Sequence, residues 1–203
     1  MRRAVLFALA GYLSGSVLFA RLAARLFHKP DLFAQSGDQN SGAFNAFQQG
    51  GFFCGSVALC GDLLKGFLPV CAYRSGGEAG PPLLLALVLA APVVGHILPL
   101  FFRFRGGKGV AVTFGCLLGL LPMWQPVILF AAAFLFFSLI LRVTSHFYRT
   151  GVTYLVTALG LALLGLDRGV LLGFCLIACA VLLRLHLSEE ARDKLEVKWL
   201  WKR

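Results

Sequence analysis

Hydrophobic and polar positions divide the chain into long apolar segments separated by short polar ones. The apolar segments cover residues 4–20, 52–73, 83–102, 110–121, 127–141, 152–166 and 170–183. Several of them approach the roughly 20 residues that an α-helix needs to cross a bilayer core. The pattern therefore predicts an all-α fold: a polytopic integral membrane bundle with about seven transmembrane helices, some of them short or re-entrant.

Composition supports a membrane protein and limits its organisation. The 203 residues are 59% hydrophobic and 14% charged, and the mean hydropathy is +0.81. We expect a single membrane domain over residues 1–203, because no polar tail is long enough for a second one. Arg2 and Arg3 precede an apolar run without a clear cleavage site, so we expect a retained first helix rather than a signal peptide.

The fourth apolar segment is short, and two arrangements fit it. Residues 110–141 form either one long helix with kinks near Pro122 and Pro126, or two short helices. With seven spans and the N-terminus outside, fourteen Lys and Arg lie on the cytoplasmic side, four lie outside, and Lys65 lies in the membrane. One merged helix would place seven inside and eleven outside, against the positive-inside rule. Two short helices are therefore favoured.

This topology places the longer polar segments on one side of the membrane. They are residues 28–51, 103–109, 142–150 and the tail 184–203. We therefore expect the functional site on the cytoplasmic face. These loops and anionic lipid explain the net charge of +10 better than nucleic acid does. The six cysteines lie in apolar segments without Cys/His clustering, so we expect buried free thiols and no metal site.

The clearest chemical signal is the run Gly106, Gly107, Lys108 and Gly109 between two apolar segments. Glycines let backbone N–H groups face an anion. Gly109 would begin the next helix, whose N-terminus adds partial positive charge to that of Lys108. The run alone could equally be a tight basic turn at the membrane surface. Its placement favours a site for a phosphorylated, lipid-linked substrate.

Three polar residues lie inside apolar segments. Asp62 and Lys65 are three residues apart, so in a helix they share a face and can form a structural ion pair directed into the bundle. A direct contact between Lys65 and substrate is the alternative. His96 is either a packing residue bonded to a backbone carbonyl or a polar residue of the site.

In order and spacing, these residues resemble the bacterial acyl-phosphate:glycerol-3-phosphate acyltransferases, the PlsY family. The similarity extends over nearly the whole chain. The matching stretches are Tyr12-Leu13-Ser14-Gly15-Ser16-Val17, Gly42-Ala43-Phe44-Asn45, Asp62-Leu63-Leu64-Lys65-Gly66, Gly95-His96-Ile97-Leu98-Pro99 and Gly106-Gly107-Lys108-Gly109-Val110-Ala111.

The resemblance implies an acyl transfer from acyl phosphate to glycerol 3-phosphate in phospholipid biosynthesis, without a cofactor. It implies membrane lipids as surroundings, no nucleic acid, and a bacterial inner membrane with the C-terminus and active site in the cytoplasm. A monomer is compatible with it. The implied catalytic residues are Ser36, Lys108 and His186. The implied substrate- and phosphate-binding residues are Asn40, Ser41, Gly42, Asn45, His96, Gly106, Gly107, Gly109 and Ser145.

Two positions depart from the family pattern. Gln48 occupies the place of a family arginine and Glu189 that of an asparagine, and the resemblance implies that both family residues help to hold glycerol 3-phosphate. The loop before Gly42 is about two residues longer than in the family. A different acceptor, or no catalysis, is therefore the second hypothesis. A small lipid-binding or transport protein is the third, although no internal repeat of the transporter kind is visible.

Cysteine-accessibility labelling tests the seven-span topology. In a Cys-free background, Gly37→Cys, Gly107→Cys and Ser188→Cys should react with an impermeant reagent from the cytoplasmic side. Ser75→Cys and Gln125→Cys should react from the outside. Labelling of positions 107 and 188 from opposite sides would show that residues 110–141 form one span.

Overall fold

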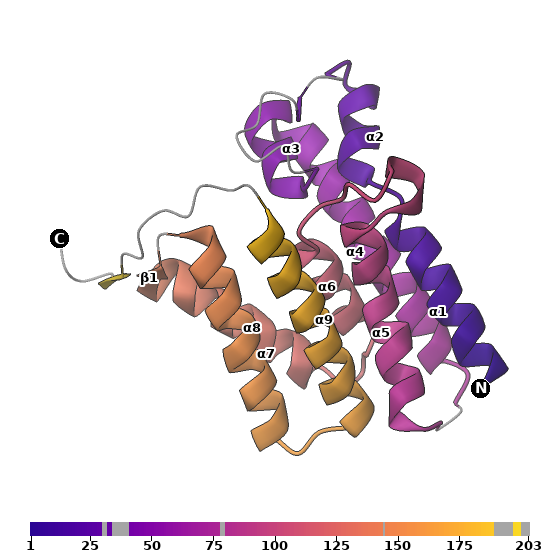
Figure 1. The fold of residues 1–203 in the computed structure, drawn as a ribbon. Helices are drawn as coiled ribbons and strands as arrows, with labels where there is room; N and C mark the ends of the chain where they lie inside the picture. The colour runs from indigo at the N-terminus through magenta and orange to yellow at the C-terminus, as the bar shows by residue number, and fades with distance from the viewer. Residues whose placement is uncertain (30–31, 34–40, 78–79, 144, 189–196, 200–203) are drawn as a thin grey trace.

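The computed structural model describes residues 1–29, 32–33, 41–77, 80–143, 145–188 and 197–199. Most of them lie in helices (Figure 1). The helices are α1 (Arg2–Gly15), α2 (Phe19–Leu26), α3 (Ala43–Gly50), α4 (Phe52–Arg74), α5 (Pro82–Ile97), α6 (Val110–Leu118), α7 (Gln125–Leu135), α8 (His146–Leu163) and α9 (Arg168–Leu187). A 3₁₀ turn, Leu100–Phe102, follows α5, and a π-helical turn, Phe136–Ile140, extends α7.

A short two-stranded sheet departs from the all-helical expectation. β1 (Leu141–Val143) pairs antiparallel with β2 (Val197–Trp199), so that Leu141 lies opposite Trp199. Strands of three residues are too short to show an alternating hydrophobic pattern, so their pairing was not visible in the sequence. The sheet connects the tail of the chain to the segment that precedes α8.

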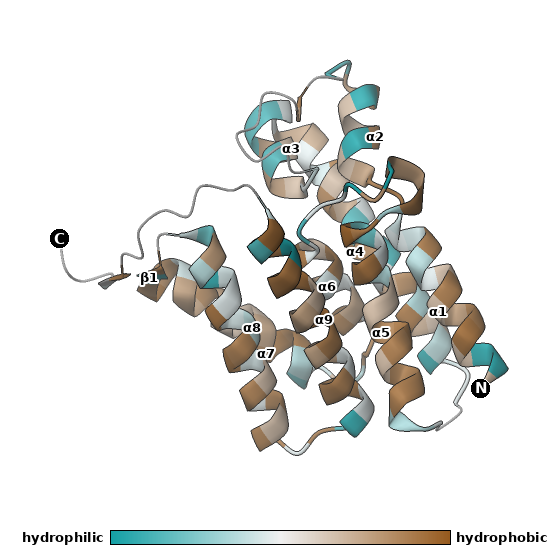
Figure 2. Cartoon of the chain, viewed as in Figure 1, coloured by the Kyte–Doolittle hydropathy of each residue, from teal (hydrophilic) through white to brown (hydrophobic). Residues whose placement is uncertain are grey.

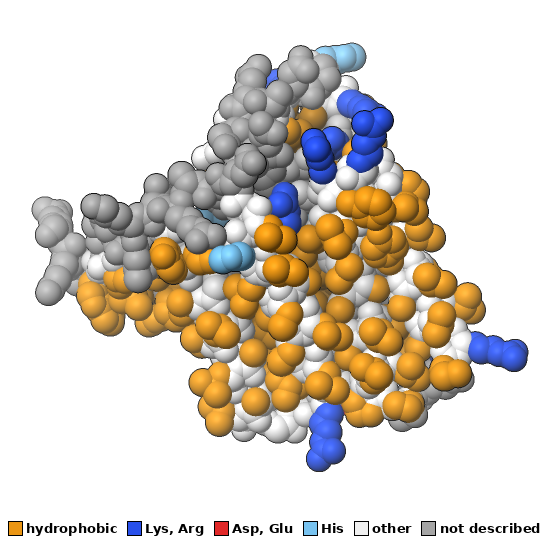
Figure 3. Space-filling model, in the orientation of Figure 1, with side chains coloured by type: hydrophobic (Ala, Val, Ile, Leu, Met, Phe, Trp, Pro, Cys, Tyr) orange, Lys and Arg blue, Asp and Glu red, His pale blue; other side chains and the backbone are white. Residues whose placement is uncertain are grey.

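Four described segments are long and apolar enough to cross a membrane: Arg2–Leu26, Phe52–Arg74, Pro82–Phe102 and Arg168–Leu187. Gln125–Ile140 is a shorter apolar helix. Hydrophobic residues predominate along the helices, and on the face drawn in Figure 3 they cover the body of the bundle, whereas several Lys and Arg gather toward its upper end (Figures 2 and 3). The predicted count of seven spans remains a prediction.

Residues 110–141 do not form one long helix. α6 ends at Leu118 and α7 begins at Gln125, and the connection between them contains a cis peptide bond before Pro122. Pro126 lies in the first turn of α7, where its missing N–H interrupts no intrahelical hydrogen bond. The arrangement found is therefore the one with two short helices.

The expectation that the cysteines are buried was wrong for part of the set. Cys54 and Cys116 are buried, but Cys60 and Cys179 are exposed. An apolar side chain on a membrane helix can face lipid as readily as the protein interior, so an apolar segment does not by itself predict burial. Within the described ranges, no group of three or more His, Cys, Asp or Glu residues is arranged to hold a metal ion.

Close packing of α1 against α5 fixes the end of α5. A Cβ at Gly15 would overlap the carbonyl oxygen of Pro92, and one at Gly95 would overlap that of Tyr12. Small residues at a helix crossing allow this approach in membrane bundles. The Tyr12 hydroxyl also donates to the carbonyl of Leu98 at 2.9 Å. α1 thus holds the point from which the glycine-rich loop begins.

The main core extends to the beginning of α6. Phe130, Tyr154 and Phe174 are fully buried, and the rings of Tyr154 and Phe174 stack with centroids 5.6 Å apart. Thr113 donates its hydroxyl to the carbonyl of Gly109 at 3.0 Å, so the Tyr154 hydroxyl, 2.8 Å away, donates to Thr113. The aromatic core therefore supports the first turn of α6, next to the glycine run.

A smaller apolar cluster packs α2, α3 and the start of α4 together. Its fully buried members include Ala20, Ala24, Ala46 and Ala58. In Figure 1, α2 and α3 lie at the upper end of the bundle, near the connection between α5 and α6. The described parts of the first polar segment and of the α5–α6 connection thus lie toward the same end of the bundle, which agrees with the predicted topology. The membrane side that this end faces remains a prediction.

Candidate functional site

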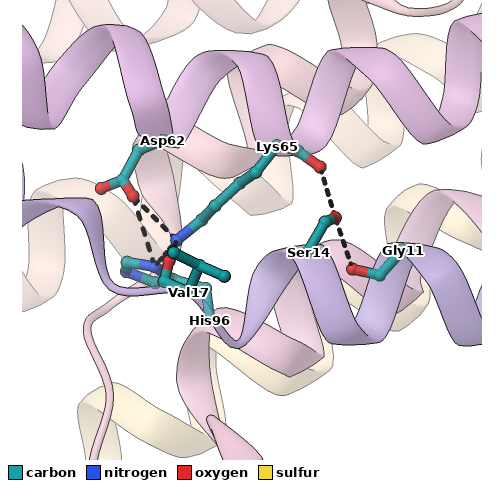
Figure 4. Close-up of polar contacts among 6 residues, drawn as sticks. All are labelled: Gly11, Ser14, Val17, Asp62, Lys65 and His96. Carbon is teal, nitrogen blue, oxygen red and sulfur yellow. Dashed lines mark hydrogen bonds and ion pairs between the residues drawn. The ribbon is translucent and has the colours of Figure 1, made fainter. Parts of the chain in front are cut away.

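Lys65 joins three elements in the interior of the bundle (Figure 4). Its Nζ lies 2.8 Å from Asp62 Oδ1, 2.7 Å from the carbonyl oxygen of Val17 and 2.7 Å from His96 Nδ1. The side chains of Asp62, Lys65 and His96 are only 2–3% exposed. Asp62 and Lys65 project from the same face of α4 because three residues separate them. The structure therefore contains the ion pair that their spacing predicts.

The lysine also determines how His96 is oriented. An ammonium group donates hydrogen bonds and accepts none, so His96 Nδ1 accepts from Lys65, and the ring proton of neutral His96 is assigned to Nε2. The Nε2 side faces the glycine run, because a Cβ at Gly107 would overlap that atom. Of the two interpretations of His96, the structure supports a polar residue that contacts the loop.

The glycine run folds back on the end of α5. The amide of Gly107 donates to the carbonyl of His96 at 3.1 Å, and Arg184 of α9 donates from Nη2 to the carbonyl of Gly106 at 3.2 Å. Gly109 directly precedes α6. Its φ of +87° is a left-handed backbone conformation, which glycine adopts without strain. The prediction that Gly109 begins the next helix is therefore confirmed.

The absence of a Cβ at Gly107 bears on the labelling experiment. Because a side chain there would displace His96, a cysteine at position 107 would disturb the loop that it reports on. Arg105 lies on the same loop and is exposed. Arg105→Cys is therefore the better labelling position for this loop.

The beginning of α6 keeps donors for a ligand. The amide of Gly107 donates to the carbonyl of His96, so it does not face an anion as the sequence predicted. Among the described residues, the amides of Gly109, Val110 and Ala111 donate to no backbone carbonyl, as is usual in the first turn of a helix. Lys108 lies beside them and is half-buried. This arrangement of donors, cation and helix N-terminus suits a phosphate group.

Ser41, Gly42 and Asn45 lie at and just before the N-terminus of α3. The exposed fractions of Ser41 and Asn45 are 1% and 7%. Arg21 of α2 donates from Nε to the Ser41 hydroxyl at 2.7 Å, and its guanidinium lies over the ring of Phe102, 5.5 Å from the centroid. Phe102 closely precedes the glycine run. Arg21 therefore bridges the start of α3 and the segment that leads into the loop.

The remaining predicted site residues differ in their exposure, and three of the positions discussed lie outside the described residues. Ser145 is 3% exposed and occupies the N-cap position of α8. His186 lies on the exposed side of the last turn of α9. Ser36, Asn40 and Glu189 lie outside the described residues. The structure brings together His96 and the glycine run, and Arg21 links Ser41 to Phe102, which precedes that run.

The sequence interpretation did not assign a role to Arg21 or Arg184. The apolar segment ends at residue 183, so the sequence pattern assigns Arg184 to the polar tail, but α9 continues to Leu187. A helical pattern extended past the first charged residue would have placed Arg184 in α9. No sequence signal distinguishes Arg21 from Arg25, since both lie in the same short amphipathic segment.

A hollow at the opposite end of the bundle lies away from these groups. Its lining includes Tyr73, Arg74, Pro82 and Asp167. Pro82 begins α5, whereas the glycine run follows the end of that helix. The length of α5 therefore separates this hollow from the candidate site.

Comparison with known proteins identifies similar chains. A family model described as glycerol-3-phosphate acyltransferase matches residues 5–192. The chain is 44% identical over 117 residues to a protein of that name from Pseudomonas fluorescens, covering 58% of this chain and 60% of the relative. It is 45% identical over 128 residues to one from Pseudomonas paraeruginosa, covering 63% and 65%. These matches span about 60% of the relatives' length.

Two solved structures share the fold, and both are of PlsY, an integral membrane glycerol 3-phosphate acyltransferase. The lysophosphatidic acid form has a TM-score of 0.75 and covers 89% of this chain and 87% of its own. The glycerol 3-phosphate form has a TM-score of 0.77 and covers 90% and 88%. Each is 26% identical to this chain. The prediction of a helical membrane bundle is confirmed.

The substitution Lys65→Met tests the buried ion pair. It removes the ammonium and leaves the Asp62 carboxylate buried without its partner, for which a loss of about 3–5 kcal/mol in stability is typical. Thermal unfolding in detergent should show a clearly lowered transition temperature. The double variant Asp62→Asn/Lys65→Met removes both charges and should recover part of the loss. Unfolding of Lys65→Met at the wild-type temperature would show that the pair does not stabilise the bundle.

Proposed function

The chain belongs to the glycerol-3-phosphate acyltransferase family, and on this premise we propose that it transfers an acyl group from acyl phosphate to glycerol 3-phosphate. The products are 1-acyl-glycerol 3-phosphate, or lysophosphatidic acid, and inorganic phosphate. The observation that supports this best is the set of donors at the start of α6, where Lys108 and the amides of Gly109 and Val110 adjoin the loop that contacts His96.

The reaction needs no covalent acyl-enzyme because a mixed anhydride is already activated. A hydroxyl oxygen of the acceptor attacks the acyl carbon, and a new C–O bond forms. The bond from that carbon to the phosphate oxygen breaks, and phosphate leaves with the electron pair. The hydroxyl proton passes to a phosphate oxygen of the substrates. The protein contributes by positioning both substrates and by stabilising the charge that develops on the leaving phosphate.

The described residues divide this work between two segments. Lys108 and the first turn of α6 bind the phosphate of the acyl donor, where each charge-assisted hydrogen bond strengthens as that group leaves. Ser41, Gly42 and Asn45 at the start of α3 bind the acceptor. Ser145 adds a hydroxyl from the N-cap of α8. The roles of Ser36, Asn40 and His186 rest on the family resemblance.

We place this site on the cytoplasmic face of a bacterial inner membrane, with the N-terminus outside and the C-terminus inside. The distribution of Lys and Arg supports this orientation. The acyl chain of the donor would lie along the apolar surface of the bundle, where many leucines are exposed. Glycerol 3-phosphate would enter from water at the polar end. The proposed reaction requires no cofactor, and a monomer is compatible with it.

A second candidate function is transfer to a different acceptor. Gln48 is exposed on α3, at the position where the family resemblance implies a cation. An amide at this position binds a dianionic phosphate more weakly than a guanidinium does. This observation favours a changed acceptor site over a loss of the donor site, because the glycine run and Lys108 keep the family pattern.

Lys108→Ala tests the donor site. The change should lower turnover by about 10²–10³-fold, since it removes one charged donor to the developing charge. Formation of lysophosphatidic acid from palmitoyl phosphate and radiolabelled glycerol 3-phosphate, measured with purified protein in lipid cubic phase, gives the rate. Arg105→Ala removes an exposed cation from the same loop and should leave the rate nearly unchanged. Near-wild-type turnover in Lys108→Ala would contradict the assignment.

Restoring the family residues tests the acceptor site. Gln48→Arg adds a cation and Glu189→Asn removes an anion, so either change should lower the KM for glycerol 3-phosphate. If both residues contact one small dianion, the double variant should improve KM by more than the separate effects combined. The KM for acyl phosphate should change little. Unchanged kinetics in both variants would show that residues other than 48 and 189 form this side of the acceptor site. Transfer to glycerol 3-phosphate in the double variant alone would indicate that the natural protein has a different acceptor or is not an enzyme.

A further inference from the structure

We propose that Arg21 supplies the cation that this chain lacks at position 48, and that its guanidinium binds the phosphate of the acceptor beside Ser41. This inference rests on the proposed function and names the residue that determines affinity for the acceptor. It assigns a role to a side chain that lies on α2, outside the segments with which the family resemblance was recognised.

The contacts of Arg21 hold its guanidinium in place without using most of its donors. Nε donates to the Ser41 hydroxyl at 2.7 Å, and the group lies over the ring of Phe102. A guanidinium carries five N–H bonds. Within the described part of the chain, Ser41 alone accepts a hydrogen bond from Arg21. The Nη groups can therefore form the two parallel hydrogen bonds with which arginine binds phosphate.

Arg21 also lies where an acceptor must bind. Ser41 directly precedes Gly42 at the start of α3, and Phe102 belongs to the segment that leads into the glycine run. A molecule at Arg21 is therefore bounded by the proposed acceptor segment and by the approach to the donor site. Transfer requires both substrates to meet, and this position satisfies the requirement.

The other arginines near the polar end are less suitable. Arg184 donates to the carbonyl of Gly106. On α8, Nη2 of Arg149 lies 3.4 Å from Nδ1 of His146. Arg25 lies one helical turn after Arg21 on α2 and is exposed. Arg149 and Arg184 also keep donors, since the Nε of each is buried without a partner, but among the described residues Arg21 is the arginine that contacts Ser41. Arg25 provides a matched control on the same helix.

The charge of the acceptor explains why the cation can move from α3 to α2. Phosphate is recognised by the positions of N–H donors, and the element that carries them is unimportant. α2 and α3 pack through alanines, including Ala20, Ala24 and Ala46. Such small side chains keep the two helices close, so a long arginine on α2 reaches the beginning of α3.

The substitution Arg21→Gln tests the proposal against Arg25→Gln. Loss of hydrogen bonds to a charged group, typically about 1.5–3 kcal/mol, should raise the KM for glycerol 3-phosphate by about 10- to 100-fold. The KM for palmitoyl phosphate should stay within about twofold, and Arg25→Gln should resemble the wild type. Arg21→Lys keeps the charge but not the paired donors, so its KM should fall between those of Arg21→Gln and the wild type.

Rescue and direct binding complete the test. Introducing Gln48→Arg into Arg21→Gln should restore much of the lost affinity, because a cation then returns from α3. Calorimetric titration of each protein with glycerol 3-phosphate, and with glycerol as the uncharged comparison, measures acceptor binding without turnover. Arg21→Gln should weaken the first titration and leave the second unchanged.

The outcomes separate this proposal from the proposed function. Wild-type affinity for glycerol 3-phosphate in Arg21→Gln would overturn the role of Arg21. Equal losses for both substrates, together with a lowered unfolding temperature in both Arg21→Gln and Arg21→Lys, would also overturn it, because they indicate a structural role. Absence of acyl transfer in the wild type would refute the proposed function, and calorimetry would still decide whether Arg21 binds the phosphate.

Discussion

The buried ammonium of Lys65 is the interaction on which the polar end of the bundle depends. A charge at this depth is expensive unless partners replace water. The partners come from Asp62 on the same helix, from Val17 just after α1 and from His96 on α5. One charge therefore fixes α1, α4 and α5 relative to one another. Each partner therefore contributes to the packing of these helices as well as to the local electrostatics.

That constraint extends to the candidate site through His96. Its Nδ1 is occupied by Lys65, and its backbone carbonyl and Nε2 side meet Gly107. Arg184 of α9 donates to the neighbouring carbonyl of Gly106. The loop is thus positioned largely through its own backbone, and the amides of Gly109, Val110 and Ala111 that follow it donate to no backbone carbonyl among the described residues. Donors fixed before the substrate arrives need no reorganisation during the reaction, which is the source of most electrostatic catalysis.

The sequence predicted those features that depend on neighbouring residues. Apolar segments of helical length, the i, i+3 spacing of Asp62 and Lys65, and a glycine before a helix are local patterns, and the structure contains each of them. Features created by long-range contacts were not predictable. The pairing of β1 with β2 joins residues more than fifty positions apart, and the contact of Arg21 with Phe102 requires α2 to pack beside the end of α5. Cys60 shows a further limit: it lies in an apolar segment but is exposed, because an apolar pattern does not tell whether a side chain faces lipid or the protein interior.

The glutamine that replaces the family arginine at position 48 has a physical interpretation, because a cation from another helix can serve the same site. Replacing arginine by glutamine at position 48 removes a charge from α3, but the site needs the charge near Ser41 rather than on a particular helix. Arg21 already donates to Ser41 and rests on Phe102, so its orientation is fixed on two sides. A guanidinium held in this way loses little conformational freedom when it binds a phosphate, whereas a free arginine side chain loses about 2 kcal/mol of rotamer entropy. Fixing one arginine can therefore offset the loss of another.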